Sequence, residues 1–373
     1  MTTQGHPKSS LSSRIKKTLT WGCTATAGVA VAAAVLVYAL SYHPKPVERL
    51  AVLGATNAPD LRPGQKLRVL TWNVQYMAGK NHRFFYEGGR DERPSAEEIE
   101  ATLAGVARVI REEEPDIVLL QEVDCRSGRT DHMDQVARLL ALLPAEYTQH
   151  VSAFYHKAAF VPHPHILGAV GMELVTLSKY RIREALRHQL PLMPKDPLTR
   201  QFYFKRAILE ARLPVAGGKD FVALNTHLDA WAAGTDTMSR QTAFAQALLE
   251  KLEDAGCTWC LGGDFNLLPP GSAGQQLPPV ERALFNSISE LTPLFARYPA
   301  VPGASETGGP DFARWFTHFS NRMPKPDRTI DYIFFSPFAK LGEHHVRQKD
   351  PGQAEFLKLS DHFPVVLEVT LPQ

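Results

Sequence analysis

The sequence predicts a mixed α/β domain that is preceded by one long apolar helix. Short apolar runs typical of buried strands alternate along the chain with amphipathic stretches that have helical spacing. Near the N-terminus, no charged residue occurs from Thr18 to Tyr42. The chain has 373 residues, of which 44% are hydrophobic and 21% charged. This is a globular composition, so we expect one large domain with an N-terminal appendage.

The apolar segment from Leu19 to Leu40 is long enough to cross a membrane. As a helix it extends about 33 Å, at about 1.5 Å per residue. Arg14, Lys16 and Lys17 precede it, and such a basic flank remains cytoplasmic. An uncleaved signal anchor would therefore place the body on the extracytoplasmic side of the membrane.

The alternative interpretation of this segment is a secretory peptide that is cleaved near Ala39-Leu40-Ser41, which also exports the body. Several prolines after the apolar segment predict a tether. The predicted organisation is a basic cytoplasmic N-terminus (1–18), a transmembrane signal anchor (19–42), a linker (43–66) and a large domain (67–373).

The charge of the large domain argues against a long groove for nucleic acid. Residues 1–66 hold eight of the 41 Lys/Arg and two of the 39 Asp/Glu, which leaves 33 basic and 37 acidic residues in the remainder. A body with a net charge of −4 has no global field that attracts polyanions. Binding of nucleic acid would require a local basic patch or a metal ion.

The first part of the body predicts two strand and helix pairs. An apolar run ends at Asn73, and a later one leads to Glu122. Between them a helix begins at Ser95, where Glu98 completes a capping box, and it ends at Pro115. The predicted elements are strand 67–72, the helix from 95, strand 116–120 and helix 133–143.

The middle of the body combines strands with one long amphipathic helix. Residues 150–168 are predicted to be a loop, and a Pro-rich segment joins the next two strands. Polar residues again follow apolar runs, at His227 and at Asp264 with Asn266. The predicted elements are strands 172–177, 205–213, 221–224 and 258–261, and helix 235–255.

The C-terminal part predicts two further strands. A short helix is expected near 279–287, and residues 299–328 are expected to be mostly loop. The strand 330–335 begins beside Asp331, and the motif Ser360-Asp361-His362-Phe363-Pro364 precedes the strand 365–369.

Carboxylates, amides and imidazoles at the ends of several strands indicate a site for a hard metal ion. Mg²⁺ binds oxygen ligands, keeps several waters and takes one or two carboxylates. Glu122 is therefore a sufficient anchor, with Asn73 or Asp361 beside it. Mn²⁺ could occupy the same ligands.

Hydrolysis of a phosphoester then needs a water in line with the leaving group and a group that orients or deprotonates it. His362 suits this role, and Asp331 is its natural partner. Asp264 and Asn266 alternate along a segment expected to be extended, which would place both on one face. His227 could bind a phosphoryl oxygen or protonate the leaving group.

Six segments, in order, resemble those of the endonuclease/exonuclease/phosphatase superfamily. This superfamily includes pancreatic deoxyribonuclease, abasic-site endonucleases, neutral sphingomyelinases and inositol-polyphosphate phosphatases. The resemblance covers about residues 67–371. The segments are LTWNVQ, LLQEVD, LNTHLD, LGGDFNLLP, RTIDYIFFS and LSDHFPVVL.

The resemblance implies a four-layer sandwich of two packed mixed β-sheets flanked by helices, with a Mg²⁺-dependent site at the strand ends. It further implies that Glu173 is a candidate for a glutamate that pairs with the family's histidine. The roles that it carries over are a metal site of Glu122, Asn73 and Asp361, a GDxN pair of Asp264 and Asn266, a catalytic dyad of Asp331 and His362, and a family histidine at His227.

Two smaller motifs are more typical of structure than of chemistry. His163-Pro164-His165 has the spacing of metal ligands, but without a third ligand it indicates a surface loop. Cys257 and Cys260 fit core packing, and a disulfide between them stays open in an exported protein.

The sequence does not decide between a lipid head-group substrate and nucleic acid. A membrane-tethered body with apolar, aromatic loops fits a sphingomyelinase-like phosphodiesterase, and an exported nuclease fits the anchor nearly as well. The inositol-phosphatase signature PAWCDR is absent from the chain, which disfavours an inositol-phosphate or other phosphomonoester phosphatase. A catalytically inactive binding protein is disfavoured because Glu122 and His362 are both present.

Overall fold

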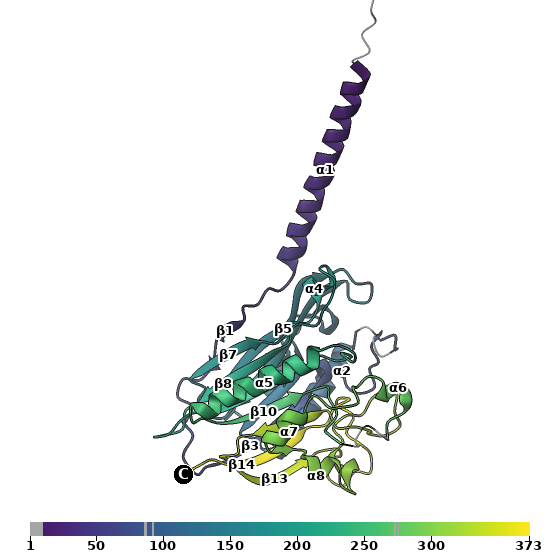
Figure 1. Cartoon of the computed structure of the whole chain (residues 1–373). Helices are drawn as coiled ribbons and strands as arrows, with labels where there is room; N and C mark the ends of the chain where they lie inside the picture. The colour runs from purple at the N-terminus through teal and green to yellow at the C-terminus, as the bar shows by residue number, and fades with distance from the viewer. Residues whose placement is uncertain (1–9, 86–87, 92, 272–273, 275) are drawn as a thin grey trace, which may run out of the picture.

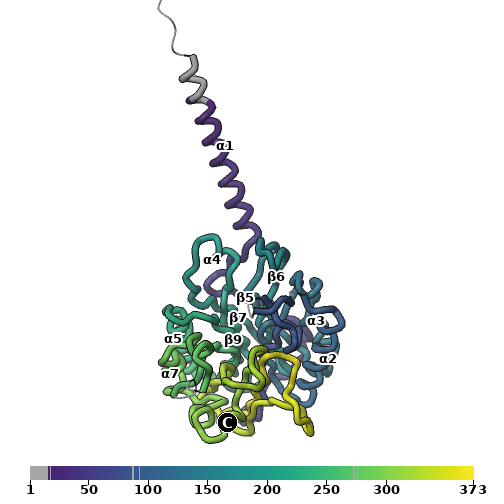
Figure 2. Tube along the Cα trace, turned by 90° about the vertical axis from the view of Figure 1, so that its right-hand side faces the viewer, coloured from purple at the N-terminus to yellow at the C-terminus, as the bar shows by residue number. Residues whose placement is uncertain are grey.

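Two seven-stranded sheets pack face to face in a computed structural model of the chain, and helices cover both outer faces (Figures 1 and 2). The structure describes residues 10–85, 88–91, 93–271, 274 and 276–373. The view in Figure 2 separates α5 and α7 on one side from α2 and α3 on the other, with strands between them. The four-layer sandwich predicted from the sequence is confirmed.

The first sheet has β3 and β4 as its parallel centre, and its other neighbouring strands pair antiparallel. Its strands, in spatial order, are β13 (Lys340–Val346), β14 (Val365–Thr370), β3 (Lys66–Asn73), β4 (Ile117–Asp124), β6 (Gly168–Ser178), β5 (Gln149–Val161) and β2 (Leu53–Gly54).

The second sheet has β9 and β10 as its parallel pair, and again the other neighbours are antiparallel. Its strands, in spatial order, are β1 (Val47–Leu50), β7 (Glu184–Gln189), β8 (Ala207–Leu213), β9 (Phe221–His227), β10 (Thr258–Asp264), β12 (Asp331–Phe335) and β11 (Ala300–Val301).

Side-chain alternation divides each central strand between two cores. In β3, Leu67 and Val69 belong to the core between the sheets, whereas Leu70 and Trp72 belong to the core beneath the outer helices. Successive side chains of a strand point to opposite faces, so this is the pattern of a strand buried on both sides. The apolar runs of the sequence are therefore central strands.

Three longer helices cover the sheets: α2 (Ala96–Glu113) and α3 (Gln135–Leu142) over the first, and α5 (Thr237–Asp254) over the second. Ser95 accepts from the Glu98 backbone N–H, and the Glu98 carboxylate accepts from the Ser95 N–H, so the predicted capping box is confirmed. Shorter helices among the described residues are α4 (Thr199–Phe202), α6 (Pro279–Arg282), α7 (Thr292–Arg297), α8 (Ala304–Thr307) and the 3₁₀ turns η1 (Gln75–Met77), η3 (Gly128–Thr130) and η4 (Phe312–Trp315).

The N-terminal helix α1 (Ser10–Leu40) projects away from the body (Figure 1). Its segment Thr18–Leu40 has a mean hydropathy of 2.0, none of it is buried, and it is long and apolar enough to span a membrane or to act as a signal sequence. The first nine residues of the predicted basic N-terminus lie outside the described residues.

Several sequence predictions differ from the structure. Residues 150–168, predicted to be a loop, are mostly strand β5, whose side chains alternate between buried and partly exposed. The predicted linker 43–66 contributes β1 and β2, which pair with the body. Strands β7 and β13 were not predicted. Their sequences, EALRHQ and KLGEHHV, contain no apolar run.

Candidate active site at the strand ends

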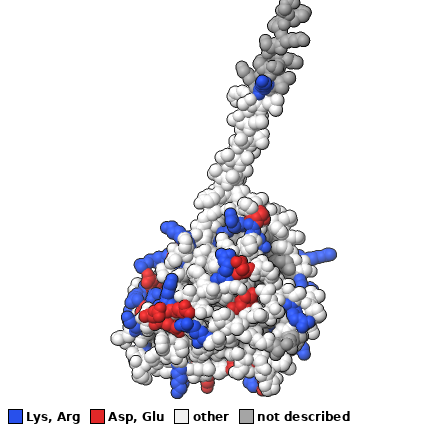
Figure 3. All heavy atoms as spheres, viewed as in Figure 1, with Lys and Arg blue, Asp and Glu red and all other residues white. Residues whose placement is uncertain are grey.

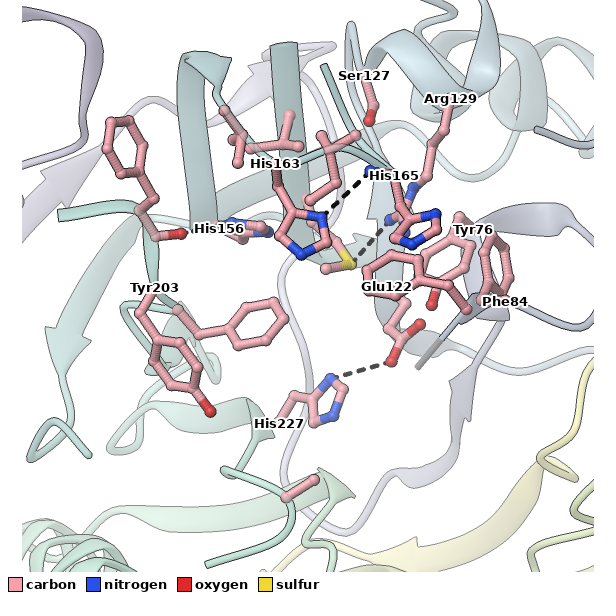
Figure 4. A pocket seen from close by; sticks show the side chains of 18 of the residues that line it. Tyr76, Phe84, Glu122, Ser127, Arg129, His156, His163, His165, Tyr203 and His227 are labelled. Atoms are coloured by element: carbon pink, nitrogen blue, oxygen red, sulfur yellow. Dashed lines mark hydrogen bonds and ion pairs between the residues drawn. The ribbon is translucent and has the colours of Figure 1, made fainter. Parts of the chain in front are cut away.

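A pocket of about 700 Å³ lies where strands of both sheets end (Figure 4). Most of the predicted site residues line it, although they are far apart in sequence. These are Glu122, His227, Asp264, Asn266, Asp361 and His362.

A β-bulge aims Glu122 into this pocket. In β4, Gln121 and Glu122 together lie opposite the single residue Leu174 of β6, and Glu122 has φ +57°. An extra residue in one strand bends it and redirects a side chain. Leu120 and Val123 can therefore both contribute to the outer core while Glu122 faces the pocket. The bulge is fixed from behind, because Gln121 donates to Asn225 of the second sheet at 2.7 Å.

Asn73 connects two carboxylates of the site. Its Nδ2 donates to Glu122 Oε1 at 3.2 Å and to Asp264 Oδ2 at 3.0 Å. Its own oxygen, Oδ1, accepts from the backbone N–H of Gln75 at 3.0 Å. Asn73 thus holds the carboxylates in place in this arrangement, and its oxygen, the atom that a metal ion would need, is engaged elsewhere.

Asp264 is the centre of the cluster. Its Oδ2 lies 3.2 Å from Nε2 of His227 and 3.7 Å from Nε2 of His362. The backbone before it needs glycine: Gly263 has φ +155°, and a Cβ there would lie 2.0 Å from the Thr226 carbonyl oxygen. The GGD sequence therefore allows close strand pairing directly before the carboxylate.

The segment after Asp264 leaves the strand, which corrects the prediction of an extended Asp264–Asn266 segment. Asn266 has φ +51°, and its N–H donates to Asp264 Oδ1 at 2.9 Å. Asparagine tolerates the left-handed region and forms this kind of local bond. Asn266 also donates from Nδ2 to the Leu228 carbonyl at 3.2 Å, and it still lines the pocket.

His362 and Asp331 form the predicted pair. His362 Nδ1–H donates to both oxygens of Asp331, at 2.9 and 3.1 Å, and both side chains are buried. Nε2 is thereby left toward Asp264 and the pocket. The backbone of His362 is fixed because Trp72 Nε1–H donates to its carbonyl at 2.9 Å.

Asp361 has a neighbour that sequence reasoning missed. His318 Nε2 lies 3.7 Å from Asp361 Oδ2, and the His318 ring packs edge-on against His362 with ring centroids 4.8 Å apart. Two sets of side chains place possible ligand atoms within 4.8 Å of one another. These sets are His318, Asp361 and His362, and Asp264, Asp331 and His362.

His227 is held by partners on both of its nitrogens. Tyr155 O–H lies 3.3 Å from Nδ1, while Nε2 faces Asp264. Figure 4 shows the ring directed toward Glu122, whose Oε1 is 3.9 Å from Nδ1. Burial, together with the charge of Arg206, holds the pKa of His227 well below its usual value, so the ring is neutral.

Glu173 does not take the role suggested for it. It lies on the face of β6 that carries Val175 and Leu177 of the outer core, away from the second sheet that carries His227. Burial raises its pKa to about 7, and its side chain bonds to Ser152. Tyr155 occupies the position beside His227 instead.

Arg206 is a buried cation in the lining of the pocket. It is 4% exposed, and its guanidinium lies 4.3 Å from the Phe204 ring centroid. Within the described part of the chain, its Nε and Nη1 have no hydrogen-bond partner, and the carboxylate oxygen Asp229 Oδ1 is 3.5 Å from Nε. A buried cation with unused donors in a pocket is suited to an anion.

The acidic groups of the pocket fit a hard divalent cation. Burial and the nearby charge of Asp361 raise the pKa of Glu122 to about 7, and burial raises that of Asp264 to about 6. Buried carboxylates need a positive charge to remain ionised. Carboxylate oxygens are ligands that a hard divalent cation prefers. Glu122 lies outside the two sets of ligand atoms named above but lines the same pocket.

The chain matches a family model, the Endonuclease/Exonuclease/phosphatase family, over residues 70–362. The chain belongs to this family. Members of the family are metal-dependent phosphoester hydrolases, and this chain is an enzyme of that class. No curated protein matches it in a sequence comparison.

The chain is also similar to several solved structures. An endonuclease/exonuclease/phosphatase from Beutenbergia cavernae is 24% identical with a TM-score of 0.54, over 83% of this chain and 72% of that one. The human Nocturnin catalytic domain is 18% identical with a TM-score of 0.49, over 86% and 96%. TDP2 from C. elegans is 15% identical with a TM-score of 0.48, over 83% and 76%.

The cysteines are not paired in disulfides. All four lie in described segments and are free thiols, and Cys257 and Cys260 are buried in or beside β10. The two residues therefore pack in the core, and the disulfide considered from the sequence is not formed.

Proposed function

We propose that the chain is a membrane-anchored, Mg²⁺-dependent phosphodiesterase. It hydrolyses the phosphodiester in the head group of a membrane phospholipid. The observation that carries this proposal is the cluster around Asp264, where two imidazoles and the amide of Asn73 meet beside Glu122. A nuclease remains the alternative that the assay below distinguishes.

In this proposal Glu122 and Asp361 would hold the metal ion, and Asn73 keeps the carboxylate of Glu122 in position. When bound, the ion neutralises charge on the phosphoryl oxygens and supports attack by water. Arg206 adds a second positive group on the side of His227, where its unused donors can bind a non-bridging oxygen.

The His362 imidazole, held by Asp331, orients the attacking water and takes its proton at Nε2. Burial alone would lower the pKa of His362, but the carboxylates of Asp331, Asp264 and Asp361 hold it well above its usual value. The ring can accept a proton at Nε2 only in its neutral form, which a cation bound beside these carboxylates would favour by offsetting their charge. His227 Nε2 lies 3.2 Å from Asp264 Oδ2, and in this proposal the imidazole positions that carboxylate in place of the leaving-group protonation considered from the sequence.

The walls of the pocket favour a lipid over a nucleic acid. Aromatic and aliphatic side chains line much of it, among them Phe85, Ile166, Leu198, Phe202 and Trp231. A strand of nucleic acid would require a basic track. We further propose that residues 1–18 are cytoplasmic and that the body lies outside the cytoplasm, since a basic flank stays inside.

The test is a parallel assay of the full-length protein in detergent micelles against four substrates: phospholipid vesicles that contain sphingomyelin and phosphatidylcholine, plasmid DNA, inositol phosphates and bis-p-nitrophenyl phosphate. We expect Mg²⁺-dependent release of a lipid head group, loss of activity with EDTA, partial recovery with Mn²⁺ and loss in His362→Ala.

The matched control is His345→Ala, an imidazole on the edge strand β13 outside the pocket. It should keep full activity. Cleavage of DNA alone would transfer the assignment to a nuclease, and activity indifferent to both EDTA and His362→Ala would refute the enzyme mechanism.

A further inference from the structure

Three large apolar side chains are exposed on two neighbouring segments of the body. Phe160 and Leu167 lie on the hairpin between β5 and β6, with 40% and 59% of their surface exposed, and Leu198, directly before α4, is 60% exposed. Burying such a side chain is worth about 1.5–3 kcal/mol. A group of them at one place indicates a surface that contacts something apolar.

Leucine at position 167 does not contribute to the stability of the fold. Its φ is +37°, in the left-handed region that favours glycine or asparagine, and its side chain meets solvent. Neither backbone conformation nor core packing selects leucine there.

These segments also form part of the pocket rim. Ile166 on the hairpin, together with Leu198 and Phe202 at α4, lines the pocket whose floor holds Asp264. His163 and His165 face the same space (Figure 4). The exposed apolar surface is therefore continuous with the mouth of the pocket.

The N-terminal helix ends beside this rim. Ser41, directly after the last residue of α1, forms a β-bridge with Ala158 of β5, and β1 then pairs with β7. In Figure 1 the end of α1 lies beside α4 and the end of β5, opposite the C-terminus of the chain. Because no free linker separates helix and body, the rim is held close to the end of the membrane-spanning segment.

The charges around the rim fit a phospholipid surface. The hairpin and the residues around α4 expose Lys157, Lys195 and Arg200 against one acid, Asp196. Figure 3 shows uncharged atoms along the part of the helix nearest the body. Basic side chains can pair with lipid phosphate groups, although the body as a whole is acidic.

We propose that the β5–β6 hairpin and α4 form a docking surface for the bilayer that α1 crosses, with Phe160, Leu167 and Leu198 inserted among the lipid head groups. The pocket rim is thereby pressed to the membrane, and its substrate is a phospholipid of that same bilayer. This inference rests on the anchor in the proposed function.

The first test measures depth without using catalysis. The full-length protein, with Cys23→Ser and Cys125→Ser, is labelled with an environment-sensitive fluorophore at Leu167→Cys, Leu198→Cys or Phe338→Cys and reconstituted into phosphatidylcholine and phosphatidylserine vesicles. Phe338 is 54% exposed and follows β12 at the end far from Asp331, so it is the control.

We expect a blue shift and quenching by spin-labelled lipid at residues 167 and 198 but not at 338. Equal, water-like emission at all three positions overturns the docking surface, whatever the substrate assay shows. The hydrolysis assay by itself decides the proposed function.

The second test separates access to lipid from chemistry. The double variant Phe160→Ser with Leu167→Asn leaves the pocket lining intact, and asparagine suits the backbone at 167. We expect hydrolysis of vesicle lipid to fall about tenfold, equivalent to about 1.4 kcal/mol, with turnover of bis-p-nitrophenyl phosphate unchanged. Equal loss of both activities, or loss of neither, contradicts the proposal.

Discussion

Replacing Asp331 by asparagine tests the proposed dyad with almost no change of shape. Asp331 accepts from His362 Nδ1–H at 2.9 and 3.1 Å in a buried site, and this bond leaves Nε2 free to face the pocket. An asparagine can present its NH₂ to Nδ1, which moves the ring proton to Nε2 and prevents that atom from accepting a proton. The pKa of His362 also falls, because one of three carboxylates that raise it is lost.

The expected loss follows from the role of the imidazole. A positioned base contributes about 10²–10⁴ in rate, which corresponds to about 2.7–5.4 kcal/mol at 1.36 kcal/mol per tenfold. We expect kcat for bis-p-nitrophenyl phosphate to fall at least about 10²-fold in Asp331→Asn, with KM little changed.

The assay compares Asp331→Asn with Asp220→Asn, a carboxylate directly before β9 at the end of that strand opposite His227. Thermal unfolding monitored by circular dichroism establishes that both variants are folded. A fall in kcat of less than about threefold in a folded Asp331→Asn protein would refute the assigned role, since it corresponds to less than about 0.7 kcal/mol.

Three further predictions concern binding, packing and pH. Arg206→Met should raise KM for phosphodiesters about tenfold, since a charge-assisted bond is lost, while Arg240→Met on the exposed surface of α5 should not; equal KM values would remove Arg206 from the site. Gly263→Ala places a methyl group against the Thr226 carbonyl oxygen and should cost about 2–4 kcal/mol of unfolding free energy, whereas Gly218→Ala, with its nearest neighbour at 3.7 Å, should cost far less in a denaturant titration. The hydrogen bond from Arg347 lowers the pKa of Glu112 below its ordinary value of 4.5. That contribution to stability is therefore complete above this value and is lost as pH falls through the lowered pKa. Below about pH 4.5, stability should fall less steeply in Arg347→Met than in the parent protein, and parallel curves would contradict this.

Local signals in the sequence were sufficient for the elements that carry one clear pattern. Ser95 and Glu98 mark the start of α2, and the apolar runs that end at Asn73 and Asp264 are central strands buried on both faces. The order of the polar residues at strand ends was sufficient to predict that they converge on one pocket. The helix start and the buried strands are local features, which periodicity can show, whereas the convergence on one pocket followed from the order of the six segments that resemble the family.

The remaining features depend on tertiary pairing. The bulge at Glu122 arises from the register shift between β4 and β6. No residue pattern in the sequence predicts it. Tyr155 contacts His227 only because β5 is a strand. The alternation of Val151, Ala153 and Tyr155 with mostly polar residues was a sequence signal for that strand. Arg206 and His318 gain their importance from burial in the pocket, which is a property of the folded chain.

The most direct test of the central claim is a Mg²⁺ titration of phosphodiester hydrolysis by Glu122→Gln and by the parent protein. If far-separated segments meet at one metal ion held by Glu122, the variant should need at least about tenfold more Mg²⁺ for half-maximal activity, in line with losses of metal-site partners. Thermal unfolding without metal should stay close to that of the parent. A Glu122→Gln protein with the same Mg²⁺ dependence and the same kcat as the parent would contradict the account.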